Sequence, residues 1–276
     1  MLQNQKNIEQ SDAEILLTQA IDQDKEFIIA HPEYKLSLWE WVKFKYYIYK
    51  RKQNYPLAYI TKKKEFYGLN FNITEDVLVP RPETEQIVDL ALDQIKKIDG
   101  RILLVDIGTG SGCIPISIVK TIKDDNKQKA IRALATDIDS DAISLAKKNA
   151  KKHSVDIGFY QGNLAQPVLD KLNCYENIII TANLPYLTEN QFNTEPSIQQ
   201  EPRQALVAEN EGLEYYEELL RQLSGTTIYD KNYTLFFEIN PQQKKGTKKL
   251  VDNHTPKKVE FKKDLKGWVR VAKITS

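Results

Sequence analysis

Short apolar runs and amphipathic stretches alternate along the chain from Arg101 onward. RILLVD (101–106) and NIIITA (177–182) are nearly continuous apolar runs, whereas SDAISLAKKNAKKH (140–153) has apolar residues at helical spacing. Strands that are apolar on both faces are typical of a parallel sheet covered by helices on both sides. The pattern therefore predicts a mostly parallel, doubly wound α/β fold, and two alternating runs around Lys266 and Gly267 predict an antiparallel hairpin at its edge.

The N-terminal part of the chain has a different pattern. DAEILLTQAID (12–22) and LWEWVKFKYYIYKRKQ (38–53) have the character of helices. The N-cap candidates are Ser11 or Asp12 for the first and Ser37 for the second. NYPLAYI is expected to be a connection, and the alternation that follows around Gly68 predicts a β-hairpin. The domains we expect are an N-terminal helical domain at 1–55, a linker with the β-hairpin at 56–80, and the α/β domain at 81–276.

Composition narrows the class of protein. Lysine and arginine (39) nearly balance aspartate and glutamate (38), so no overall charge favours binding to nucleic acid or to a membrane surface. The chain has no apolar run long enough to span a bilayer and begins without a secretory h-region, which predicts a cytoplasmic protein. Cys113 and Cys174 lie among apolar neighbours and are expected to be buried free thiols. The three histidines have no partner at metal-ligand spacing, so no metal site is expected.

A glycine-rich loop follows the first strand of the predicted sheet. In LLVDIGTGSGC (103–113), Asp106 precedes glycines at 108, 110 and 112. The spacing is neither the GxGxxG of dinucleotide sites nor a phosphate loop, and an acid before GxGxG suits a ligand that carries an ammonium and a sulfonium group. The next strand ends at Asp137, whose carboxylate can accept hydrogen bonds from both hydroxyls of a ribose. Together the two features predict a nucleoside-type cofactor at the carboxyl ends of the strands.

This order of motifs resembles the class I methyltransferases that use S-adenosyl-L-methionine. The resemblance implies a Rossmann-like domain with a mostly parallel seven-stranded sheet, and it places the loop that contains Asn163 near the adenine. The cofactor-binding residues it implies are Asp106, Gly108, Thr109, Gly110, Ser111, Gly112, Asp137, Asn163, Leu164 and Asn183.

After the fourth strand, Asn183-Leu184-Pro185-Tyr186 resembles the catalytic motif (N/D)PPY of methyltransferases that act on a planar nitrogen. The lone pair of such a nitrogen is delocalised, so orientation matters. The Asn183 side-chain oxygen and the Leu184 carbonyl can each accept one N–H, while Tyr186 stacks on the plane of the acceptor. Proline is usual at position 184. The backbone carbonyl is retained whatever the side chain, and Pro185 still favours an extended Leu184.

A more specific resemblance comes from further segments that occur in order. They are PLAYI (56–60), FYGLNF (66–71), VLVPRPETE (77–85), NLPYL (183–187), EPRQAL (201–206) and DLKGWVRV (264–271). This succession resembles the HemK/PrmC family of protein-glutamine methyltransferases. The resemblance implies methyl transfer to the side-chain amide nitrogen (N5) of the glutamine in the Gly-Gly-Gln motif of class 1 peptide chain release factors. It also implies a monomer that docks the release factor through its N-terminal domain, with Arg81 and Glu83 contacting the substrate.

Three alternatives remain at this point. A DNA adenine-N6 methyltransferase shares the strand-end motif but should add a basic target-recognition domain, which the near-neutral charge disfavours. A ribosomal-protein glutamine methyltransferase would use the same motifs. A cofactor-binding scaffold with catalysis lost at Leu184 is disfavoured because Asp137, Asn183 and Tyr186 are retained.

Overall fold

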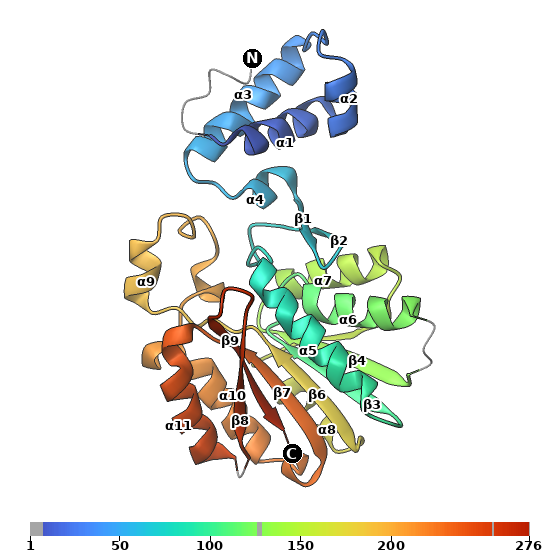
Figure 1. Cartoon of the computed structure of the whole chain (residues 1–276), viewed down its shortest axis with the longest axis vertical. Helices are drawn as coiled ribbons and strands as arrows, with labels where there is room; N and C mark the ends of the chain where they lie inside the picture. The colour runs from blue at the N-terminus through green and yellow to red at the C-terminus, as the bar shows by residue number, and fades with distance from the viewer. Residues whose placement is uncertain (1–7, 126–128, 256, 276) are drawn as a thin grey trace.

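The computed structural model describes residues 8–125, 129–255 and 257–275; residues 1–7 of the predicted N-terminal domain lie outside these ranges. A seven-stranded sheet has the order β5-β4-β3-β6-β7-β9-β8 (Figure 1). Its strands are β3 (Ile102–Ile107), β4 (Ile131–Asp137), β5 (Gly158–Gln161), β6 (Asn177–Ala182), β7 (Asn232–Glu238), β8 (Val259–Lys263) and β9 (Val269–Thr275). The first five of these pair in parallel, and β9 pairs antiparallel with both β7 and β8. The predicted Rossmann-like sheet and its C-terminal hairpin are confirmed.

Helices cover both faces of the sheet. On one face lie α5 (Glu85–Lys96), α6 (Cys113–Asp124) and α7 (Ser140–Lys152), and on the other lie α8 (Leu169–Leu172), α10 (Glu214–Ser224) and α11 (Lys244–His254) (Figure 1). Strand β3 shows why its run is apolar throughout. Ile102 and Leu104 pack into the core under α5 and α6, while Leu103 and Val105 pack into the core under α10.

The N-terminal helices form a separate small core. They are α1 (Gln10–Ile21), α2 (Lys25–Ala30), α3 (Leu38–Lys52) and α4 (Leu57–Thr61). Leu16 of α1, Phe44 of α3 and Ile60 of α4 are buried together, whereas Tyr59 of α4 packs into the core of the sheet domain. The hairpin of β1 (Lys63–Phe66) and β2 (Leu69–Asn72) follows as predicted (Figure 1), and its Phe66 and Phe71 pack into the core of the sheet domain.

Local signals gave one correct and one incorrect helix start. Ser37 caps α3 in a complete capping box with Glu40. The predicted cap at Ser11 or Asp12 is wrong, because α1 begins at Gln10 and places both residues inside its first turn. Asp12 instead pairs with Arg51 of α3, with 2.6 Å between Oδ2 and Nε.

Two further expectations need correction. The segment around Leu57 forms α4 instead of a plain connection. Cys113 is buried as predicted, but Cys174 is exposed, because it precedes β6 in a loop and not in the sheet. Helix α9 (Glu189–Thr194) was also not predicted. None of the described helices is long and apolar enough to cross a membrane.

Candidate active site

A cavity of about 500 Å³ opens at the carboxyl ends of β3, β4 and β6. The chain turns from β3 towards β4 on one side and from β6 towards β7 on the other, so the cavity lies at the switch point of the sheet, where open α/β folds bind ligands. The predicted site residues that line it are Arg81, Gly108, Thr109, Gly110, Ser111, Asp137, Asn163, Leu164, Asn183, Leu184 and Pro185. The remaining predicted residues, Glu83, Asp106, Gly112 and Tyr186, lie outside the lining.

The glycine loop packs directly against the Asn-Leu-Pro-Tyr segment. Gly108 and Gly110 have φ of 69° and 52°, in the left-handed region that favours glycine. A Cβ on Gly108 would lie 2.8 Å from Leu184 Cδ2, which is too close for any side chain to fit without a shift. Leu184 is only 3% exposed. The loop and the segment after β6 therefore form one continuous wall of the cavity.

Asp137 holds the glycine loop as well as lining the cavity. Its Oδ2 accepts a hydrogen bond from the Gly110 N–H at 2.8 Å, and its Oδ1 accepts one from the Asp139 N–H at 3.0 Å. Burial raises the pKa of Asp137, and these backbone hydrogen bonds oppose that shift. Since each carboxylate oxygen can accept a second hydrogen bond, the side chain still offers acceptors to a ligand.

Asp106 lies beneath the loop instead of facing the cavity. It is 1% exposed, and its Oδ1 accepts a hydrogen bond from Thr181 Oγ1 at 2.6 Å, while Oδ2 has no hydrogen-bond partner among the described residues. Burial raises the pKa of Asp106 to about 7. The structure thus places an ionisable, buried group at the end of β3, outside the lining of the cavity.

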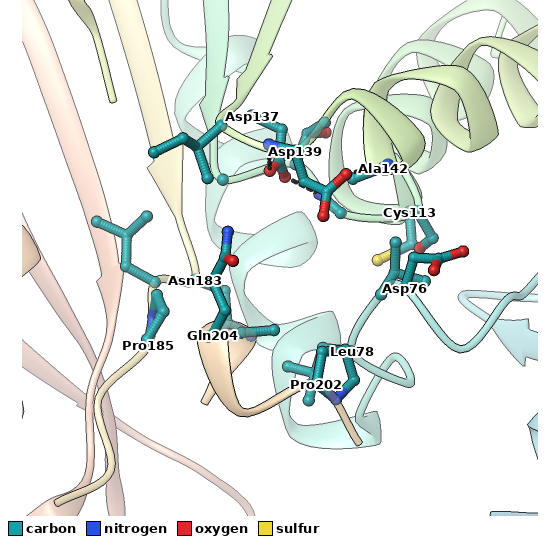
Figure 2. Close-up of a pocket in the computed structure, with 18 of the residues that line it drawn as sticks. Asp76, Leu78, Cys113, Asp137, Asp139, Ala142, Asn183, Pro185, Pro202 and Gln204 are labelled. Atoms are coloured by element: carbon teal, nitrogen blue, oxygen red, sulfur yellow. Dashed lines mark hydrogen bonds between the residues drawn. The ribbon is translucent and has the colours of Figure 1, made fainter. Parts of the chain in front are cut away.

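Asn183 has one end of its amide held and the other end free. Its Nδ2 donates to Thr84 Oγ1 at 3.1 Å, whereas its Oδ1 is buried and has no partner among the described residues. Figure 2 shows Asn183 between Asp137 on one side of the cavity and Pro202 on the other. A buried carbonyl oxygen without a partner is costly unless a ligand supplies the missing donor. This oxygen is the acceptor that the site offers to an N–H group.

Tyr186 is anchored at both its backbone and its hydroxyl. Its hydroxyl donates to Glu238 Oε1 at 3.3 Å, and its backbone oxygen accepts from Gln243 Nε2 at 2.9 Å. A Cβ on Gly212 would lie 2.1 Å from this same oxygen, so the turn is closely packed. These contacts fix Tyr186, which follows Pro185 in sequence and lies outside the lining of the cavity.

Arg81 reaches the cavity through an ion pair with Glu201. The Arg81 guanidinium binds Glu201 Oε1, and Glu201 Oε2 accepts the Val79 N–H at 3.0 Å. The PRPETE and EPRQAL segments therefore hold each other across the cavity mouth. Sequence reasoning named neither Glu201 nor Thr84 as a site residue, although both lie in segments it had singled out.

Asp76 and Leu78, from the loop after β2, and Pro202 and Gln204 also line the cavity (Figure 2). Leu78, Pro202 and Gln204 lie in segments that the sequence analysis singled out, but the local pattern does not show which side chains of those segments face a cavity. Within the described residues, no group of three or more histidine, cysteine, aspartate or glutamate side chains could hold a metal ion.

Comparisons with known proteins agree with this architecture. The family model of the PrmC N-terminal domain matches residues 1–61, and that of the methyltransferase small domain matches residues 86–208. The release factor glutamine methyltransferase of Mycoplasma mycoides subsp. mycoides SC is 36% identical, over 96% of this chain and 92% of that protein. The protein of the same name from Staphylococcus aureus is 31% identical, over 98% of this chain and 94% of that protein.

Solved structures show the same fold at low identity. The catalytic domain of human METTL16, solved in complex with a hairpin of the MAT2A 3′UTR, superposes with a TM-score of 0.55 at 19% identity, covering 80% of each chain. The N-terminal domain of human METTL16 in complex with SAH has a TM-score of 0.50 at 18% identity, covering 76% of each chain. These likenesses concern the fold of the sheet domain.

Proposed function

The chain belongs to the family of release factor glutamine methyltransferases, and from this premise we propose that it methylates N5 of the glutamine in the Gly-Gly-Gln motif of class 1 release factors. The protein is an S-adenosylmethionine-dependent protein-glutamine methyltransferase that acts on a release factor. The motif and the nitrogen atom are the proposed part. The observation that carries the proposal is the buried, unpaired Oδ1 of Asn183 in the cavity wall.

The residues present fit the cofactor. S-adenosylmethionine supplies a methyl group already activated on a sulfonium, together with a ribose and an adenine. We assign the ribose hydroxyls to Asp137 and the adenine to the loop with Asn163 and Leu164. Thr109 and Ser111 belong to the glycine loop and line the same cavity. The cavity of about 500 Å³ is of a size that such ligands occupy. We assign Asp106, which lies under the loop, to electrostatic support of the cationic part.

The chain has to orient the amide nitrogen of the substrate towards the methyl group of the cofactor. An amide nitrogen is a poor nucleophile because its lone pair is delocalised into the carbonyl group. We propose that Asn183 Oδ1 and the Leu184 carbonyl accept its two N–H bonds, which directs the nitrogen at the methyl group, and that Tyr186 supports the acceptor plane. Placing the reacting atoms in near-attack geometry can supply much of the rate enhancement. The nitrogen loses its proton to water after transfer, so no general base is assigned.

The protein substrate needs more than the cavity. We propose that the helical domain at 1–55, joined through residues 56–80 to the catalytic domain at 81–276, docks the release factor, and that Arg81 and Glu83 contact the residues that flank the glutamine. Helix α3 supports this role, because Trp39 and Tyr49 are 82% and 62% exposed on it. We further propose that the protein acts as a monomer in the cytoplasm and binds no nucleic acid directly.

The test is incubation of the purified full chain with methyl-labelled S-adenosylmethionine and a purified class 1 release factor, followed by mass spectrometry of the peptide that contains Gly-Gly-Gln. We expect one methyl group on the side-chain nitrogen of that glutamine. The matched control is the same release factor with Gln→Asn in that motif, which should remain unlabelled. Label on a ribosomal protein or on DNA, with the release factor unlabelled, would overturn the proposal.

A further inference from the structure

A buried carboxyl group lies behind Asn183 and has no role in the function proposed above. Glu238 ends β7 and is 2% exposed. Its Oε1 accepts a hydrogen bond from the Tyr186 hydroxyl at 3.3 Å, and its Oε2 has no hydrogen-bond partner among the described residues. An acidic side chain is costly to bury unless it is paired. A buried carboxyl group with one unpaired oxygen at the end of an interior strand therefore calls for a neighbouring donor.

We propose that Glu238 is a positioning residue, acting through Thr84, that sets which end of the Asn183 amide faces the substrate. The inference rests on the proposed function, because it concerns how the same site binds the substrate amide. Glu238 itself touches neither substrate nor cofactor; it acts at the far end of a chain of hydrogen bonds.

The first step of the argument is the direction of the known hydrogen bond. Asn183 Nδ2 is a donor only, so at 3.1 Å the Thr84 hydroxyl oxygen must be the acceptor. The hydroxyl has a single hydrogen, which has to point elsewhere. Thr84 is 2% exposed, so water is not the natural partner for that hydrogen.

The second step is the acceptor for the Thr84 hydrogen. Burial raises the pKa of Glu238, and the neighbouring hydroxyls of Thr84 and Tyr186 oppose that shift. The two groups left unsatisfied behind Asn183, a hydroxyl hydrogen and a carboxylate oxygen, thus complement each other. When Glu238 accepts from Thr84, the lone pairs of that hydroxyl face Asn183.

The third step is the consequence for the substrate. With an acceptor at Thr84, the Asn183 NH₂ group turns towards it, which leaves Oδ1 as the end of the amide without a partner among the described residues. Without Glu238, the Thr84 hydroxyl is free to donate to Asn183 instead. The amide would then turn over and present NH₂ to the incoming NH₂ of the glutamine. Donor would face donor, and the substrate nitrogen would lose its orientation.

The test compares variants of the full chain acting on the release factor. Thr84→Val removes the hydroxyl at nearly constant volume, and Thr84→Ser keeps it. Glu238→Gln puts an NH₂ donor in place of one acceptor oxygen, so that a single oxygen remains for the hydroxyls of Tyr186 and Thr84. We expect Thr84→Val and Glu238→Gln to lower kcat by roughly a hundredfold, the cost of a misplaced reacting group, with the dissociation constant of S-adenosylmethionine unchanged. Thr84→Ser should have a kcat close to the wild-type value, because it keeps the hydroxyl. Glu260→Gln removes an exposed carboxylate on β8 and is the control for loss of charge.

The double variant Thr84→Val/Glu238→Gln separates a chain of hydrogen bonds from two independent effects. If the residues act in series, the double variant should be no slower than either single variant. Multiplied effects, or wild-type kcat in Thr84→Val, would overturn the inference.

An activity-independent measurement keeps the two proposals distinct. The side-chain amide NMR signals of Asn183, assigned by their loss in Asn183→Ala, should shift in Glu238→Gln while backbone signals remote from the site stay in place. Unchanged Asn183 signals would count against the inference. Failure of the wild-type chain to methylate the release factor would instead count against the proposed function.

Discussion

At the scale of single residues, Asn183 should separate binding from chemistry. Asn183→Ala removes the free oxygen but leaves the glycine loop and Asp137 in place. We expect kcat to fall by about 10²–10³, the cost of losing one preorganised hydrogen-bonding group, while cofactor affinity changes by less than about threefold. Single-turnover kinetics and titration calorimetry with S-adenosylmethionine would measure the two quantities. Near-normal turnover would refute the role assigned to this side chain.

Asp106 predicts a pH dependence of cofactor binding. Burial raises its pKa to about 7 in the protein without ligand, so the carboxyl group is protonated below that value. A cation bound above the loop favours the ionised form, and binding at low pH must therefore release a proton. We expect the dissociation constant of S-adenosylmethionine to be constant above pH 7. Below pH 7 it should rise by up to about tenfold per pH unit, which means weaker binding.

The control for that titration is Asp106→Asn, in which no charge remains beneath the loop. This variant should bind the cofactor more weakly at pH 8 and should lose the pH dependence between about 5.5 and 7. The pKa of Asp137 is also raised by burial, and this residue lines the same cavity. A pH profile that survives in Asp106→Asn would therefore assign the titration to Asp137.

At the scale of elements, helix α10 holds the end of β6 in place. Tyr216 of α10 donates its hydroxyl hydrogen to the Glu238 backbone oxygen and accepts the Leu184 N–H at 3.2 Å. Tyr216→Phe leaves both backbone groups buried and unpaired. A buried backbone group without a hydrogen bond destabilises the folded state by about 1–3 kcal/mol. We therefore expect the free energy of unfolding to fall by about 2–4 kcal/mol.

Urea denaturation would measure that loss, with Tyr229→Phe as the matched control. The Tyr229 hydroxyl lies 3.5 Å from the Leu220 oxygen, a weak contact, within the same apolar core. Its removal should change the free energy of unfolding by less than about 0.5 kcal/mol. Equal effects of the two substitutions would show that Tyr216 contributes packing alone.

The elements that could be predicted are those whose signal is local. The strands and the glycine loop follow from short apolar runs and from residues adjacent in sequence. Helix α4 has only five residues, too few to show a period. Helix α11 contains Gly246, and a glycine at that position in the sequence argues against a continuous helix. In the structure, a Cβ at Gly246 would lie 2.6 Å from Leu213 Cδ1, so glycine permits the close approach of that side chain.

The partners within the site could not be predicted for the same physical reason. Asn183 and Thr84 are 99 residues apart in the chain, and Val79 and Glu201 are 122 apart. Only the folded sheet brings these pairs together. The sequence predicts which side chains carry the chemistry, whereas the structure was needed to show which groups contact them. It also shows that the Leu184 side chain, at the position where the motif usually has proline, fills the space beside Gly108.

At the scale of the whole molecule, the helical part and the cavity should contribute separately to substrate binding. Helices α1–α3 stand at one end of the molecule, away from the sheet (Figure 1). Trp39 and Tyr49 of α3 are largely exposed there, and aromatic anchors of this kind are the side chains that dominate protein interfaces. Because they are remote from the cavity, they can affect docking of an intact release factor without affecting the chemistry.

We therefore expect Trp39→Ala/Tyr49→Ala to raise KM for an intact release factor by about tenfold, the equivalent of about 1.4 kcal/mol of lost binding. Its kcat should be unchanged, and so should both constants for a short peptide that contains the target glutamine. Ile29→Ala, at a side chain 69% exposed on α2, is the matched control. Steady-state methylation assays on the two substrates would measure all four constants. Should the double substitution impair the peptide and the intact protein alike, the helical part would be supporting the catalytic domain instead of docking the substrate.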